Sequence, residues 1–308
     1  MKKNRLADRA KFLKLASISV SQGMRAGIFS SKFRGRGIEF DSVREYEFDD
    51  DVRTIDWNLT ARSGKAFVKL YREERDLNFF LLVDSSASMH IKFDGVSVFE
   101  KALDVSGLLL FAAYHSGCPV GAIPFAGTQG KALLPQSGEE YVLSILSNIE
   151  NFAYNTESQI KGTAMSKAIA GASRFLRGRA MVIIISDFKV AGYADELATL
   201  SRKHDCVAIR IISPFDYKLP PVGVVPFVDS ESNMEILAPT GSVDFQNERM
   251  RNFSEELVRW KNMCIKYGVL PLEMPLKADS VQALTNFFLS AKNKREFLNN
   301  LKLGRNLV

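Results

Sequence analysis

The chain has 308 residues, of which 46% are hydrophobic and 25% are charged, and its formal net charge is +6. These values are typical of a soluble globular protein with one large domain or two modest ones. The sequence has no uninterrupted apolar run as long as a membrane span, and the charged N-terminus lacks a signal-peptide core, so we expect a cytoplasmic protein. The three cysteines are scattered among apolar residues, which predicts reduced core thiols rather than disulfides or a zinc site.

The first 77 residues form the first of two expected domains, an N-terminal basic helix followed by an arginine-rich segment. Apolar residues at roughly helical spacing predict a helix over residues 5–24. Glycines, serines and basic residues predict a loop over residues 29–36. Residues 37–48 and 65–71 have the alternation and composition of extended strands. We therefore expect a small α+β extension at residues 1–77.

The second expected domain, residues 78–308, alternates apolar strands with amphipathic helices. Residues 79–83 (FFLLV) form a short, continuous apolar run, which is typical of a strand buried on both faces. The same reasoning predicts strands over residues 120–125, 180–185, 206–212 and 269–274. Helices are predicted over residues 98–114, 139–150, 163–176, 195–203, 253–267 and 280–289. This order indicates an α/β fold with a doubly wound, mostly parallel sheet flanked by helices.

Oxygen-bearing side chains stand where two of these buried strands end. Asp84, Ser86 and Ser88 follow the first strand, Asp187 follows another, and Thr163 stands at the start of a predicted helix. In a doubly wound sheet, strand ends and the first turns of the following helices share one edge. Hard oxygen ligands suit Mg²⁺, Mn²⁺ or Ca²⁺ rather than Zn²⁺. The pattern predicts a divalent-cation site that can accept one further carboxylate, supplied by an acidic group of a partner.

This arrangement is similar to the metal-ion-dependent adhesion site of von Willebrand factor A domains, in which a DxSxS motif, a distal threonine and a distal aspartate hold Mg²⁺ or Mn²⁺. The resemblance assigns the metal-binding role to Asp84, Ser86, Ser88, Thr163 and Asp187. It implies a von Willebrand factor A-like, Rossmann-like domain. It also implies a function in protein binding rather than in catalysis.

A longer resemblance covers most of the chain. Residues 35–62 (GRGIEFDSVREYEFDDDVRTIDWNLTAR) resemble the hallmark segment of the bacterial domain-of-unknown-function 58 family, and so do residues 185–188 and 202–231. Genes of this family usually lie beside a MoxR-type AAA+ ATPase, which implies such an ATPase as a partner. Two segments depart from the family pattern. Residues 48–51 read FDDD where many members read GDD, and residues 213–216 read SPFD where DPxE is common.

Two other functions stay open beside a non-enzymatic, metal-dependent protein-interaction module. The first is a phosphatase-like hydrolase with Asp84 as its nucleophile, although Ser86 stands where that chemistry places a second acid. The second is nucleic-acid binding through the basic N-terminal region, which would also suit peripheral association with a membrane. The chain has neither a G-x-S-x-G motif nor a phosphate-binding G-x-x-x-x-G-K-[ST] loop. We favour the interaction module.

Overall fold

The computed structural model describes residues 2–26, 38–48, 50–73, 77–127, 129–155, 164–228 and 235–290. The chain divides into two compact units, one formed by Met1–Ile28 together with Leu77–Val308 and the other by Phe29–Asp76. The first helix therefore belongs to the larger unit, whereas the sequence analysis grouped it with the arginine-rich segment in residues 1–77.

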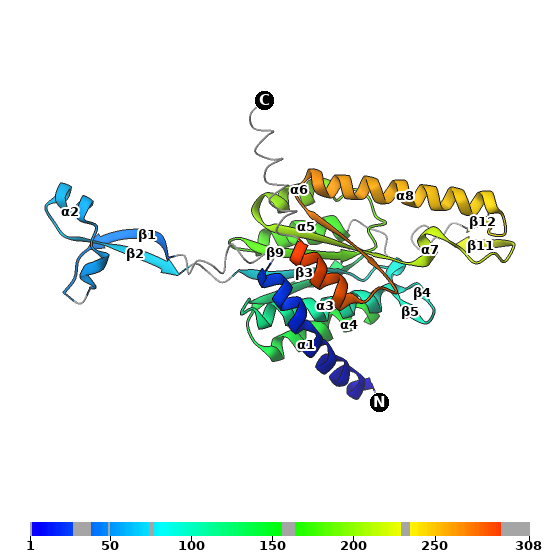
Figure 1. The fold of residues 1–308 in the computed structure, drawn as a ribbon, viewed down its shortest axis with the longest axis horizontal. Coiled ribbons are helices and arrows are strands. Elements are labelled where there is room, and N and C mark those ends of the chain that lie inside the picture. Colours follow the sequence, from blue (N-terminus) through cyan, green and yellow to red (C-terminus); the bar gives the residue numbers. More distant parts are fainter. Residues whose placement is uncertain are drawn as a thin grey trace, which may run out of the picture. The chain divides into compact units, whose positions relative to one another are not determined.

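The larger unit is built on a seven-stranded sheet with the strand order β13-β10-β9-β3-β6-β7, and β8 also pairs with β6. Figure 1 labels its central strands β3 and β9. The parallel strands are β3 (Asn78–Asp84), β6 (Val120–Ala126), β9 (Ala180–Ser186), β10 (Asp205–Ile212) and β13 (Leu270–Pro275). Two short strands, β7 (Gln129–Gly130) and β8 (Leu133–Gln136), run antiparallel to β6. The central strands β3 and β9 are buried along nearly their whole length. Successive side chains of a strand point to opposite faces of the sheet, so a strand whose two faces are both covered by helices is apolar at every position.

Helices cover both faces of this sheet, which confirms the predicted α/β class (Figure 1). On one face lie α5 (Ala164–Phe175), α6 (Ala194–Lys203) and α8 (Val243–Lys266). Their apolar side chains share a core with Phe80, Leu82, Val182 and Ile184 of the central strands. On the other face, α3 (Val98–His115) and α4 (Glu139–Asn155) contact β3 and β6.

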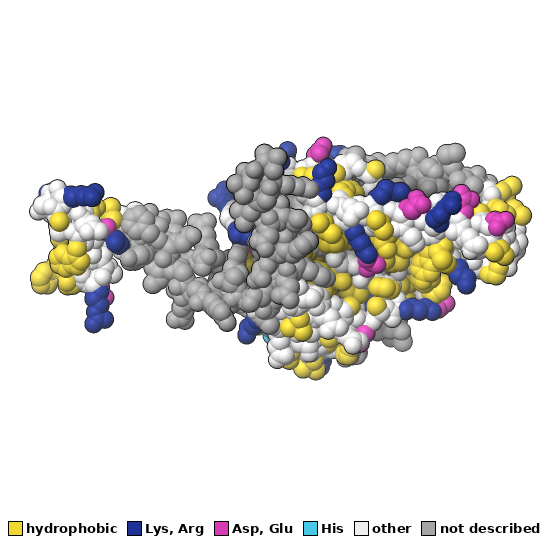
Figure 2. All heavy atoms as spheres, turned by 45° about the horizontal axis from the view of Figure 1, so that its top comes forward, with side chains coloured by type: hydrophobic (Ala, Val, Ile, Leu, Met, Phe, Trp, Pro, Cys, Tyr) yellow, Lys and Arg dark blue, Asp and Glu magenta, His cyan; other side chains and the backbone are white. Residues whose placement is uncertain are grey.

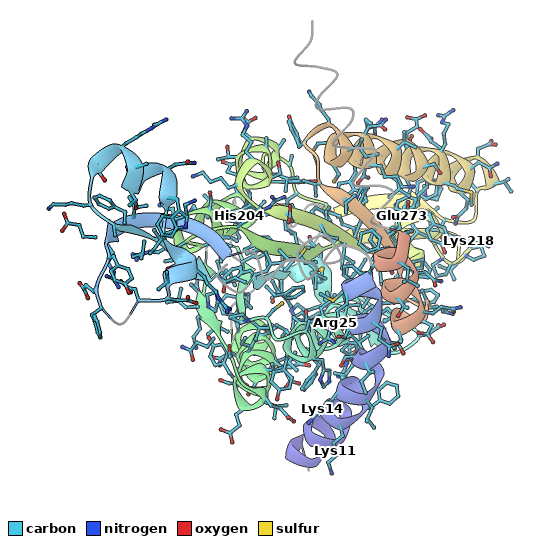
Figure 3. The ribbon with its side chains drawn as sticks, turned by 60° about the vertical axis from the view of Figure 1, so that its left-hand side comes forward. Lys11, Lys14, Arg25, His204, Lys218 and Glu273 are labelled. Atoms are coloured by element: carbon cyan, nitrogen blue, oxygen red, sulfur yellow. The ribbon has the colours of Figure 1, made fainter. Side chains whose placement is uncertain are left out.

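The first helix, α1 (Lys2–Ala26), packs against α3, and residues 280–290 form a further helix. The buried face of α1 consists of Leu13, Ser17, Val20, Ser21 and Met24. Ion pairs flank this apolar contact: Arg9 Nε lies 2.7 Å from Asp104 Oδ1, and Lys14 Nζ lies 2.6 Å from Glu139 Oε1. Figure 3 labels Lys14 on this helix. The basic helix is thus part of the packed structure of the larger unit.

The smaller unit is a two-stranded ribbon with a short helix. The two extended segments predicted at residues 37–48 and 65–71 are strands β1 (Ile38–Glu45) and β2 (Phe67–Glu73), and the structure pairs them antiparallel. Helix α2 (Trp57–Ser63) begins after Asp56, whose carboxylate accepts hydrogen bonds from the Asn58 and Leu59 amides. A 3-10 helix at Val52–Thr54 precedes it. The predicted loop at residues 29–36 lies outside the described residues.

Shorter elements connect the larger ones. They are the 3-10 helix Ala87–His90, the hairpin of β4 (Lys92–Phe93) and β5 (Val96–Ser97), helix α7 (Pro214–Tyr217), and the hairpin of β11 (Val224–Val228) and β12 (Glu235–Pro239). Helix α8 begins at Val243, ahead of its expected start at residue 253. Ser242 caps it by accepting a hydrogen bond from the Phe245 amide. The first turns of α8 are largely exposed and carry little apolar periodicity. The sequence pattern therefore predicted only the later part of the helix, which packs on the sheet.

Gly121 in β6 occupies a place where a side chain does not fit. A methyl group there would stand 2.7 Å from the carbonyl oxygen of Leu133 and 2.7 Å from the Phe80 ring. We expect Gly121→Ala to lower the free energy of unfolding by about 1–3 kcal/mol, because buried backbone cannot move aside without strain. Urea unfolding monitored by circular dichroism measures this change.

The matched control is Gly171→Ala in α5, where the added methyl group would meet its neighbours at 3.7 Å or more. Alanine is the better helix former, so this variant should be as stable as the original protein or more stable by up to about 1 kcal/mol. Equal losses of stability in the two variants would contradict the close packing at Gly121.

Candidate metal centre

The candidate site lies at the carboxyl ends of β3 and β9. These strands are parallel neighbours with Val83 opposite Ile185, so Asp84 and Asp187 leave the sheet at the same edge. Both residues are buried, with 2% and 3% of their surface exposed. The structure therefore brings together the two acidic residues that the sequence analysis selected.

Hydrogen bonds hold both carboxylate oxygens of Asp84. The Ser86 amide donates to Oδ1 at 2.9 Å, and the Ser186 hydroxyl donates to Oδ2 at 2.6 Å. Ser186 Oγ in turn accepts a hydrogen bond from the Phe188 amide at 2.9 Å. Ser186 is fully buried, and the sequence analysis did not select it. The sequence feature that could have identified Ser186 is its position directly before Asp187, as a hydroxyl residue at the end of a buried strand.

The DxSxS segment brings two hydroxyl groups close together. After β3, the Ser85 amide donates to the Phe125 carbonyl at 2.8 Å, which holds the loop beside β6. The chain then enters the 3-10 helix, where Ser86 Oγ lies 3.3 Å from Ser88 Oγ. Ser88 is buried and Ser86 half-buried. Thr163, the remaining predicted ligand, lies outside the described residues.

Asp187 has one oxygen that accepts no hydrogen bond. The Lys189 amide donates to Oδ1 at 3.3 Å, whereas buried Oδ2 has no hydrogen-bond partner within the described part of the chain. The Lys189 ammonium lies 3.4 Å from Oδ2 as an ion pair. Between these residues, Phe188 has a left-handed backbone with φ of 54°, a conformation that costs free energy for a non-glycine residue. Its ring packs against Trp260, with 5.2 Å between ring centroids, which anchors the turn.

These residues fit a hard divalent cation. Buried carboxylate and hydroxyl oxygens are the donors that Mg²⁺ and Mn²⁺ take. Among the residues that the structure describes, Asp187 Oδ2 accepts no hydrogen bond and has only the Lys189 ammonium beside it, so it can still serve as a ligand to a metal ion. Across the described ranges, no group of three or more His, Cys, Asp or Glu side chains has the geometry to hold a metal ion. The candidate centre therefore depends on its serine hydroxyls as well as on its aspartates.

The electrostatics of the site favour a positive charge beside Asp84. The pKa of Asp84 is raised to about 7. The largest cause is burial of the carboxylate, and the second is the negative charge of Asp187. The hydrogen bonds from Ser186 and Ser86 oppose this shift, because they stabilise the carboxylate. Without a cation, a proton therefore occupies Asp84 over much of the acidic and neutral range. A divalent cation that binds here would replace that proton.

His90 is the histidine nearest in sequence to this loop. It is half-buried, and its ring stacks on Phe99 with 5.3 Å between centroids. Burial lowers the pKa of His90. His90 is therefore held by packing against the aromatic side chain of α3.

The comparisons with known proteins now identify the family. Residues 42–259 match the family described as "Protein of unknown function DUF58". The chain belongs to this family. An uncharacterised protein of Mycobacterium tuberculosis is 29% identical over 234 residues, which cover 75% of this chain and 72% of the relative.

Solved structures similar to this chain include hypothetical protein BatB from Bacteroides thetaiotaomicron and the VWA domain of SpRpn10. BatB is 16% identical, with coverage of 71% of this chain and 99% of that chain and a TM-score of 0.41. The SpRpn10 domain is 11% identical, with coverage of 68% and 94% and a TM-score of 0.38. In the DUF58 chain itself, the parallel sheet with helices on both faces is the architecture expected of a von Willebrand factor A-like domain. None of the described helices is both long enough and apolar enough to cross a membrane.

The raised pKa of Asp84 predicts how stability depends on pH. The folded, metal-free protein binds a proton at Asp84 up to about pH 7, whereas the unfolded chain releases it near the ordinary value of 3.8. The free energy of unfolding should therefore fall as pH rises between these values, by about 1.4 kcal/mol for each pKa unit realised. Urea unfolding with a chelator at about pH 5 and about pH 7.5 measures this fall.

The control for this experiment is Asp84→Asn, which cannot ionise. Relative to this variant, the original protein should lose stability as pH rises through the interval. Parallel stability curves for the two proteins would show that Asp84 titrates near its ordinary value, contrary to the expectation.

Proposed function

We propose that this DUF58 protein is a non-enzymatic, metal-dependent protein-interaction module. In this proposal Asp84, Ser86, Ser88, Thr163 and Asp187 hold Mg²⁺ or Mn²⁺ at the carboxyl edge of the sheet. The ion supplies a positive charge that binds a carboxylate side chain of a partner protein.

The observation that carries the proposal is the pair of buried aspartates at the ends of neighbouring strands. Asp84 is aligned by Ser186, and Asp187 keeps one oxygen free of hydrogen bonds. Two buried carboxylates side by side are unfavourable unless a cation or a proton separates them. Ser86 and Ser88 add neutral oxygen donors within reach of the same site.

The donor set also supports an acidic partner. Five protein donors leave at least one position open on a six-coordinate Mg²⁺ ion, and water or an external carboxylate can fill it. A carboxylate is the natural choice because it brings both a hard oxygen ligand and a negative charge. The partner surface should therefore present an exposed aspartate or glutamate.

The two alternative functions receive less support from the described residues. A hydrolase would need Asp84 as a free nucleophile, whereas both of its oxygens accept hydrogen bonds and Ser86 stands at the position for the second acid. Nucleic-acid binding would need a continuous basic track. Arg9 and Lys14 of the basic helix instead pair with acidic residues, and the face in Figure 2 has basic and acidic side chains interspersed.

The partner that we propose is a MoxR-type AAA+ ATPase or one of its client proteins. The support is the family resemblance of the arginine-rich segment, because genes of this family usually lie beside genes for such ATPases. We also propose that the protein acts in the cytoplasm. The three cysteines are buried thiols, which suits a reducing compartment.

Calorimetric titration with Mn²⁺ and Mg²⁺ tests this function directly. We expect saturable binding to the chelator-treated protein, weakened at least about tenfold in Asp84→Ala and in Ser86→Ala, because each variant removes an oxygen donor of the centre. The matched control is Glu255→Gln, which removes a surface carboxylate that pairs with Arg259 on α8. That variant should bind the metal as the original protein does.

A pull-down with the candidate ATPase extends the test to the partner. Capture should require Mn²⁺ or Mg²⁺ and should be lost with chelator or with Asp84→Ala. Two results would rule the proposal out: no saturable metal binding by the original protein with the ATPase present, or equal binding by all the variants.

A further inference from the structure

A lysine side chain lies against the candidate metal centre. Lys189 Nζ is 2.8 Å from Asp216 Oδ1 and 3.4 Å from Asp187 Oδ2. Both carboxylates are largely buried, with 3% of the Asp187 side chain and 9% of the Asp216 side chain exposed. The ammonium group thus bridges two shielded negative charges at the edge where the candidate centre lies.

The bridge joins the ends of two neighbouring strands. Lys189 follows β9, and Asp216 lies in α7, directly after β10. Asp216 is itself fixed, because its Oδ2 accepts a hydrogen bond from the Ser213 amide at 2.7 Å as part of a capping box. On the other side, the anchored ring of Phe188 sets the turn from which Lys189 extends. The ammonium group is therefore held in place from both sides.

Lys189 stays positively charged in this position. A lysine side chain carries a positive charge at neutral pH, and the two carboxylates in contact with Lys189 Nζ favour that charged form. A divalent cation that used Asp187 Oδ2 as a ligand would meet this positive charge at close range. Like charges a few ångströms apart in a partly desolvated site repel strongly.

We propose that Lys189 is a tethered counter-cation that lowers the affinity of the centre for divalent metal ions, and that Asp216 weakens this effect by drawing the ammonium group away from Asp187. The inference rests on the proposed function, because it concerns the regulation of the same site. It assigns opposite roles to two residues that touch each other. Removing the lysine charge should strengthen metal binding, and removing the Asp216 charge should weaken it.

Calorimetric titration of the full-length protein with Mn²⁺ alone, at neutral pH after chelator treatment, tests this inference. Lys189→Met keeps most of the length of the side chain and removes the charge, so its affinity for Mn²⁺ should rise roughly tenfold. Lys189→Arg keeps the charge and should stay within about threefold of the original protein. Asp216→Asn can still accept the Ser213 hydrogen bond, and its affinity for Mn²⁺ should fall several-fold because Lys189 then faces Asp187 alone.

Thermal unfolding of each variant in chelator provides a second readout. If Lys189 only stabilised the fold, Lys189→Met and Asp216→Asn would both lower the melting temperature. Both variants would then also bind the metal more weakly. Changes of affinity in opposite directions are the result expected from the counter-cation role.

The outcomes separate this inference from the proposed function. If the original protein binds Mn²⁺ and Lys189→Met binds it equally or more weakly, the inference is wrong and the metal centre stands. If Lys189→Met binds Mn²⁺ and the original protein does not, the counter-cation role is supported and resting occupancy of the centre is excluded. If neither protein binds Mn²⁺ while both remain folded, the proposed function and the inference both fail.

Discussion

The parallel pairing of β3 with β9 is the constraint on which the rest of the structure depends. Both strands are apolar on both faces, so a shift of one residue would exchange the two sides of a closely packed core. The observed register places the ends of the two strands side by side. The buried aspartates, the serine loop and Lys189 all take their positions from that edge.

Charge at this edge is balanced by groups that reach across strands. Ser186 of β9 donates its hydroxyl to Asp84 of β3, and Lys189 connects the end of β9 to the segment after β10. Buried carboxylates destabilise a fold unless such partners surround them. In the proposed function, the same contacts that stabilise the carboxylates would also set how strongly a cation binds there. Fold stability and metal affinity would then be coupled at this site.

The sequence predicted the large features of this molecule because they follow from local patterns. Apolar runs indicated the parallel strands, and the hydroxyl and carboxylate residues after them indicated that Asp84 and Asp187 would meet. Ser186, Lys189 and Asp216 were missed because their importance comes from contacts between strand ends, which periodicity does not encode. The placement of α1 with the larger unit was missed for the same reason, since its partner α3 is distant in sequence. The first turns of α8 were missed because they carry little apolar pattern.

The edge strand β13 has a consequence for how the protein behaves at high concentration. It lies at the rim of the sheet and contains Pro271 and Pro275, which lack the amide hydrogen that a neighbouring strand would need. Open strand edges are the usual starting point for sheet-to-sheet self-association between molecules. The two prolines leave gaps in the row of backbone hydrogen-bond donors along β13, so a strand of another molecule pairs with it poorly. This protects a long apolar sheet from uncontrolled polymerisation.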